Sequence, residues 1–209
     1  MGFERMWLTK LRAALERVAG PGLTDEFLQG SQEFKENTPA GEVISWTASM
    51  VEKLNALLSP CQVNEVITSC ACHYPSAKLA PIRDAFRESH DFAQAISMLN
   101  GQFSQMLTGV LGFDEGTVEM LLADGMGPAG ILEDDRIVAI KIPKSGNLRD
   151  WLAENEPAAK RKLYCHCPRI RDAVEMGISV PVEYCLCGAG FYRNIWEEIT
   201  EQPVRLLRT

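Results

Sequence analysis

Apolar residues recur every three to four positions through most of the first 124 residues. The two clearest stripes are Phe3, Trp7, Leu11, Leu15 and Val18, and Phe92, Ile96, Leu99, Phe103, Met106 and Val110. This spacing places apolar side chains on one face of a helix. It predicts helices over residues 3–18, 43–57, 63–70, 77–89, 91–111 and 115–123. We interpret the stripes as a packed core.

The pattern changes in the last 85 residues. The glycine-rich stretch 125–130 lacks the Lys-Ser or Lys-Thr ending of a phosphate loop and is interpreted as a connector. Alternation and β-branched residues predict a hairpin over 131–142 and strands over 178–184 and 204–207. Helices are expected over 148–155, from Pro157 onward and over 191–200. The predicted fold class is therefore α+β, with a helical part (1–124) packed on a smaller mixed α/β part (125–209) around one shared core.

The net charge and the search for targeting signals limit the classes of partner that we expect for this protein. The net charge is −7 and the isoelectric point about 5.1, which opposes general nucleic-acid binding because that needs an excess of cations. No apolar run near the N-terminus indicates a signal peptide, and none approaches the roughly 18 residues of a membrane span. We expect a cytoplasmic protein with no membrane partner, whose thiols stay reduced. The oligomeric state has no signature in the sequence.

One local cluster of cations departs from the acidic balance. Lys160, Arg161 and Lys162, followed by Arg169 and Arg171, flank a cysteine pair. They fit a solvated helix face, and they also fit cations that hold thiolates or an anionic ligand in place.

Six of the seven cysteines occur as Cys-x-Cys pairs. Two pairs repeat a longer unit, Tyr-Cys-x-Cys, at residues 164–167 and 184–187. The third pair is Cys70 and Cys72, with His73 beside it. Matched spacing indicates a task that needs several thiolates together, which means metal binding or thiol chemistry. A purely structural role for the cysteines is the remaining interpretation.

The metal interpretation comes first. Thiolates select zinc or iron–sulfur clusters, and a structural zinc site takes four ligands. One intervening residue puts both side chains on the same side of an extended segment, so the four cysteines could share one ion. The predicted ligands are Cys165, Cys167, Cys185 and Cys187, with Cys70, Cys72 and His73 joining this site or forming another; Cys61 and His166 are further candidates. Zinc is the expected metal, and an iron–sulfur cluster is the alternative.

Thiol reactivity is the second interpretation. Pro168 and Gly188 are each predicted to begin a helix, and the partial positive charge at a helix N-terminus favours a thiolate. Cys187, with Arg193 one turn further on, is the candidate nucleophile. Gly188 and Gly190 would let backbone N–H groups approach a ligand, and Arg169 and Arg193 would be its cationic contacts. The glycines equally fit close packing of the helix start.

Four segments together resemble an uncharacterised family of anaerobic bacteria and archaea. They are Cys-Ala-Cys-His-Tyr-Pro (70–75), Lys-Ile-Pro-Lys-Ser-Gly-Asn (141–147), Tyr-Cys-His-Cys-Pro-Arg (164–169) and Tyr-Cys-Leu-Cys-Gly-Ala-Gly-Phe-Tyr (184–192). The resemblance covers most of the chain from about residue 60 on. It implies no particular activity.

The last quarter also resembles the C-terminal module of L-2-amino-thiazoline-4-carboxylic acid hydrolases and of the 4-vinyl reductase domain. The similarity lies in a Cys-containing segment and helix over 185–197, followed by residues 204–207. In those modules a Gly-Asp segment and another Cys follow, and the sequence reaches Thr209 before any such segment. This resemblance implies a hydrolase or a ligand-binding role.

The sequence therefore predicts a cysteine-rich zinc-binding protein that acts as a sensor or a small-ligand-binding module. The alternative is a hydrolase-type or thiol-dependent enzyme acting on a small sulfur- or nitrogen-containing substrate.

Overall fold

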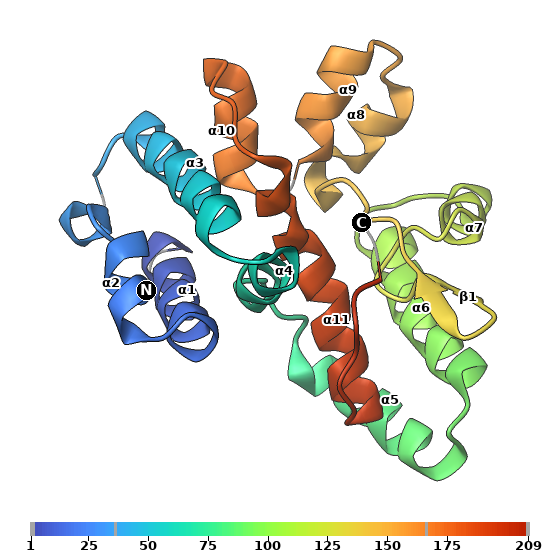
Figure 1. Cartoon of the computed structure of the whole chain (residues 1–209). Coiled ribbons are helices and arrows are strands. Elements are labelled where there is room, and N and C mark those ends of the chain that lie inside the picture. The colour runs from blue at the N-terminus through green and yellow to red at the C-terminus, as the bar shows by residue number, and fades with distance from the viewer. Residues whose placement is uncertain (1–2, 36, 166, 208–209) are drawn as a thin grey trace. The chain divides into compact units, whose positions relative to one another are not determined.

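The computed structural model describes residues 3–35, 37–165 and 167–207 (Figure 1). Helix makes up 68% of it and strand 4%. The fold class is therefore helical, and the α+β prediction is wrong.

The helices and strands follow one another along the chain in a simple order. The helices are α1 (Phe3–Val18), α2 (Pro21–Phe27), α3 (Ala40–Leu57), α4 (Pro60–Ser69), α5 (Ser76–Ser89), α6 (Phe92–Gly109), α7 (Glu115–Ala123), α8 (Leu148–Ala153), α9 (Pro157–Tyr164), α10 (Pro168–Met176) and α11 (Leu186–Thr200). Short 3₁₀ turns are η1 (Ser31–Glu33), η2 (Ser145–Asn147) and η3 (Val182–Cys185), and the strands are β1 (Ile131–Glu133) and β2 (Arg136–Val138).

The chain forms two compact units, each built from two separate stretches. The first unit comprises residues up to 72 and residues 149–190, and the second comprises residues 73–148 and those from 191 on. The predicted boundary between residues 124 and 125 lies inside the second unit. Each unit has its own cluster of buried apolar side chains.

The first unit is a helical assembly in which α1 packs on α4 and α2, and α3 packs on α10. Its helix ends follow the sequence signals. Ser59 and Gln62 form a capping box at the start of α4, and Gly177 ends α10 in the left-handed conformation. The buried side chains of its core include Trp7, Leu11, Leu15, Phe27, Met50, Leu54, Val66, Ile67, Cys70 and Tyr184.

The second unit combines α5, α6, α7 and the β1–β2 hairpin. The strands are antiparallel, with Ile131 opposite Val138. Asp134 turns the hairpin with a φ of 54°. The core is formed by Leu79, Ile82, Phe86, Ala95, Leu99, Ala129, Ile195, Trp196 and Ile199.

Two predicted strands are helical or irregular in the structure. Residues 182–185 form the 3₁₀ turn η3 instead of continuing a strand from 178, and residues 204–207 have no regular structure. A strand needs a partner for its backbone ladder. The described residues of the first unit offer none, and Pro181 also lacks a donor, so the β propensity of Val180 and Val182 is overridden.

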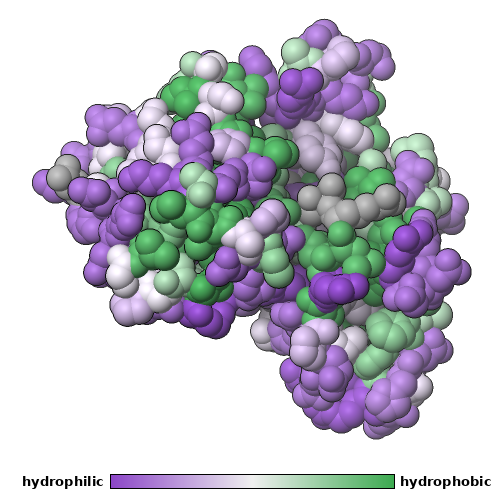
Figure 2. Space-filling view, in the orientation of Figure 1, coloured by the Kyte–Doolittle hydropathy of each residue, from purple (hydrophilic) through white to green (hydrophobic). Residues whose placement is uncertain are grey.

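Hydrophilic residues cover much of the face shown in Figure 2, and apolar residues interrupt them in patches. The most exposed large apolar side chains are Val110 and Val182, each with 76% of its surface accessible. Among the described residues, none of the helices has the length and apolar character needed to cross a membrane.

Candidate functional site: thiols around Tyr184

All seven cysteines belong to the first unit, and one member of each Cys-x-Cys pair lies in its core or packs against it. Cys70 is buried in the core, whereas Cys72 is exposed. Cys187 is half-buried and packs against the same core, whereas Cys185 is exposed. In the remaining pair Cys167 packs against this core. Each pair therefore contributes one thiol to one region of the first unit.

Backbone conformation explains the division at residues 185 and 187. Helix α11 begins at Leu186, so Cys187 is its second residue and not the residue before a helix that starts at Gly188. Side chains two positions apart on a helix point in nearly opposite directions. The prediction that both cysteines lie on one side of an extended segment is therefore wrong for this pair. At Cys165 and Cys167 the backbone is extended, as predicted.

Tyr184 lies among these thiols. Its ring is 2% exposed, and its hydroxyl oxygen lies 3.5 Å from Cys167 Sγ and accepts a hydrogen bond of 3.3 Å from Arg169 Nη1. Burial raises the pKa of Tyr184 well above its usual value. Arg169 opposes this rise, and the nearby Cys167 and Cys187 add to it. The phenol is therefore a neutral hydrogen-bonding group that joins a thiol to a cation.

Arg169 is a charged residue with almost no solvent contact, since only 3% of it is exposed. Its guanidinium donates to the Glu4 carboxylate and lies 4.1 Å from the centre of the Trp7 ring. Burial disfavours the charged guanidinium, but Tyr184 and Glu4 outweigh this effect and raise the pKa of Arg169. The buried cation is consequently fixed beside the thiols by three partners.

Cys70 is the most buried thiol of the cluster. Its Sγ donates to the Val66 carbonyl at 3.3 Å. Burial raises the pKa of the Cys70 thiol, and Cys187 raises it further, while Lys10 and Arg169 act in the opposite direction. The thiol is thus protonated at neutral pH, and Cys187 lies near enough to influence it.

Gly190 explains why the two ends of the cysteine region meet. A Cβ at this position would lie 2.1 Å from the Thr68 carbonyl oxygen, which is closer than any real side chain comes. Helix α11 therefore crosses the C-terminal end of α4 at Gly190. This contact brings Cys187, three residues earlier, toward Cys70, two residues after Thr68. It favours the packing interpretation of Gly190 over the ligand-binding one.

The other predicted site residues lie elsewhere. His73 is exposed and is the first residue of the second unit. Arg193 also belongs to the second unit, where its Nε lies 3.5 Å from Glu197 Oε1. Gly188 is half-buried in α11, and Cys61 is exposed in the first turn of α4. His166 lies outside the described residues.

Sequence reasoning did not identify Tyr184, Glu4, Trp7 or Lys10 as members of this region. One signal for Tyr184 was present, because both repeated units begin with a tyrosine. Lys10, whose ammonium donates to the Ala71 carbonyl, and Glu4 come from α1. Their positions depend on tertiary packing and have no signature near the cysteines.

Within the part of the chain that the structure describes, no group of three or more His, Cys, Asp or Glu side chains is arranged to hold a metal ion. Comparison of the chain with protein-family models, with curated proteins and with solved structures finds no match.

Proposed function

We propose that this protein binds a soft metal ion, zinc first, through the inward-facing thiols Cys70, Cys167 and Cys187, and acts as a metal sensor or a small-ligand-binding module. The observation that carries the proposal is that three Cys-x-Cys pairs, spread over more than 110 residues, each direct one thiol to the region around Tyr184. Cysteine sulfurs are the soft ligands that zinc, iron–sulfur clusters and copper(I) select.

The surroundings support thiolate formation when a metal replaces the thiol protons. Cys167 occupies the N-cap position of α10, and Cys187 lies in the first turn of α11. Helix N-termini and nearby cations both favour a thiolate. Lys10 and Arg169 lower the pKa of Cys70 against the larger effect of burial. Metal binding would release the Cys70 proton, so affinity should increase with pH.

The test combines elemental analysis of protein purified without oxygen with titration by zinc. We expect bound zinc in the wild-type protein. Serine variants of Cys70, Cys167 and Cys187 should each bind zinc at least tenfold more weakly, because each removes one ligand. Cys61→Ser is the matched control and should bind as the wild type does. Absence of saturable binding, or equal loss in the control, would contradict the proposal, and a coloured protein with bound iron would redirect it to a cluster.

Thiol chemistry is the second candidate, favoured by one specific contact. Cys167 Sγ and Tyr184 Oη are 3.5 Å apart, and Arg169 donates to the same hydroxyl. This arrangement could orient a thiol toward a small sulfur- or nitrogen-containing substrate. Cys187 is the alternative nucleophile. Mass-spectrometric mapping of alkylation, with and without a chelator, separates the two candidates, because a metal ligand is protected until the chelator is added and a catalytic thiol reacts in both cases.

A further inference from the structure

A cavity of about 390 Å³ opens in the first unit between the end of α3, the start of α4 and η3. Its lining combines polar and apolar side chains, namely Asn55, Leu58, Pro60, Val63, Asn64, Glu183 and Leu186. We propose that it binds a small organic cation, a primary ammonium on a short apolar chain, with Glu183 as the anchor. This inference goes beyond the metal site and uses none of its thiols.

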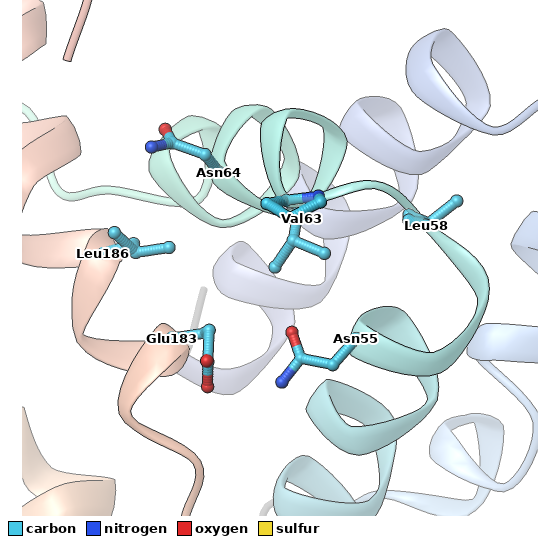
Figure 3. Close-up of a pocket in the computed structure, with 7 residues that line it drawn as sticks. Asn55, Leu58, Val63, Asn64, Glu183 and Leu186 are labelled. Carbon is cyan, nitrogen blue, oxygen red and sulfur yellow. The ribbon is translucent and has the colours of Figure 1, made fainter. Parts of the chain in front are cut away.

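The cavity has the size and the mixed surface of a small-ligand site. Its volume lies toward the lower end of the 300–1,000 Å³ typical of ligand pockets, so the occupant is small. Figure 3 shows Asn55 on α3 and Glu183 on η3 facing each other, with Val63 on α4 near the same space. Leu58, Val63 and Leu186 supply the apolar wall, which suits a short hydrocarbon chain.

The charges around the cavity favour a cation. Glu183 is half-buried and takes part in none of the ion pairs found among the described residues. Helix α3 ends at Leu57, next to Leu58 of the cavity wall, and carries no basic residue in its last turn. The carbonyl groups at a helix C-terminus carry a partial negative charge. The Glu183 carboxylate and the C-terminal end of α3 therefore both favour a cation in the cavity.

Backbone donors at the N-terminus of α4, on the other side of the cavity, already have partners. Helix α4 begins at Pro60, and its N-terminal donors would favour an anion. The Ser59 hydroxyl accepts from the Gln62 backbone N–H, and the Gln62 side chain accepts from the Ser59 backbone N–H, so the capping box uses these groups. The Glu183 carboxylate only accepts hydrogen bonds, whereas the amides of Asn55 and Asn64 both donate and accept. An ammonium group has three N–H donors and no acceptor, so it matches the carboxylate and the two amide oxygens.

The test uses butylammonium as the probe, with butanol and butyrate as neutral and anionic molecules of similar length. Nuclear magnetic resonance of the full chain follows the side-chain amides of Asn55 and Asn64. Butylammonium should shift both signals saturably, butanol at least tenfold more weakly, and butyrate not at all. Glu183→Gln should weaken butylammonium binding about tenfold, because one charge-assisted hydrogen bond is lost. Glu52→Gln, an exposed carboxylate on α3, is the matched control and should change nothing.

Several results would overturn the proposal. They are butyrate binding as tightly as butylammonium, unsaturable shifts with butylammonium, or equal affinities for Glu183→Gln and Glu52→Gln. Asn55→Leu, at an exposed position, gives a second test if Glu183→Gln fails to fold, and it should also weaken binding. Since these variants keep every cysteine, their zinc content reports on the thiol site separately.

Discussion

The cores of the two units differ in chemistry. The core of the second unit is made of aliphatic and aromatic side chains, and all seven cysteines lie outside that unit. The first unit includes Cys70 and Tyr184 in its core and buries Arg169 beside them. All the buried polar and charged residues among those described, including Thr24, Thr47 and Thr68, also belong to it.

This difference in core composition indicates that the first core is not built for stability alone. A buried charge costs free energy unless it is paired, and a buried ion pair is often no more stabilising than apolar residues of the same volume. The second unit avoids this cost because its core is apolar. In the first unit, Arg169 is held by Glu4, Trp7 and Tyr184 directly beside the thiols. We infer that the polar groups around Arg169 serve the thiols.

The largest effect should come from a matched pair of glycines, one in each unit. Gly190→Ala places a Cβ 2.1 Å from the Thr68 carbonyl oxygen, whereas Gly101 in α6 has nothing within 4 Å of the added atom. Because the obstacle at Gly190 is backbone, we expect a loss of about 3 kcal/mol in the free energy of unfolding. Gly101→Ala should raise it by up to about 1 kcal/mol through helix propensity. Urea unfolding measures both, and equal values would contradict the close crossing of α4 and α11.

The second effect concerns the buried hydroxyl of Tyr184. Tyr184→Phe removes the group that accepts from Arg169 and contacts Cys167. A buried guanidinium that loses an acceptor costs about 2 kcal/mol of folding free energy. Tyr192→Phe in the second unit is the control, since its hydroxyl is exposed to solvent and donates to the Ile140 carbonyl; we expect a change within about 0.5 kcal/mol. Similar losses in both variants would show that the two units tolerate polar deletions alike.

The sequence predicts the helices of both units better than their strands. The helical stripes correspond to α1, α3, α4, α5, α6 and α7, because amphipathic spacing records which face is buried. The hairpin is also confirmed as β1 and β2. The predicted strand at 178–184 failed because β propensity needs a neighbouring strand, and only tertiary structure supplies one. The α+β assignment failed with it.

The candidate site was predictable in its residue types but not in its geometry. Repetition of Cys-x-Cys identified the thiols, yet the helical start at Leu186 turns Cys185 and Cys187 to different sides. The contribution of α1 through Glu4 and Lys10 has no local signal, because both residues lie at least 60 positions from the nearest cysteine pair and reach it only through tertiary packing. For Gly190 the sequence left ligand binding and close packing as equal alternatives, and the approach of the Thr68 carbonyl favours packing.

The third effect is the pH dependence that Cys70 contributes from the first core. Burial raises the pKa of Cys70 above its usual value of 9.0. Above pH 9 the unfolded thiol ionises while the buried thiol keeps its proton, so the unfolded state binds fewer protons and the free energy of unfolding falls as pH rises. With a chelator present, we expect Cys70 to contribute a loss of up to about 1.4 kcal/mol between pH 9 and pH 10. Cys70→Ala should remove this slope, and Cys61→Ala, at a solvated position, should keep it. An unchanged slope in Cys70→Ala would mean that its thiol is not buried in solution.

The smallest effect compares the two cysteines of one pair. Cys72 is exposed, so Cys72→Ser should alter the free energy of unfolding by no more than about 0.5 kcal/mol. Cys70→Ser puts a hydroxyl in the place of a buried thiol whose only described hydrogen bond is to the Val66 carbonyl, and we expect a loss of about 1 kcal/mol. The same ordering should appear in zinc affinity, where Cys72→Ser binds as the wild type does. If Cys72→Ser loses zinc as strongly as Cys70→Ser, both members of the pair are ligands, and the division into inward and outward thiols does not describe the working site.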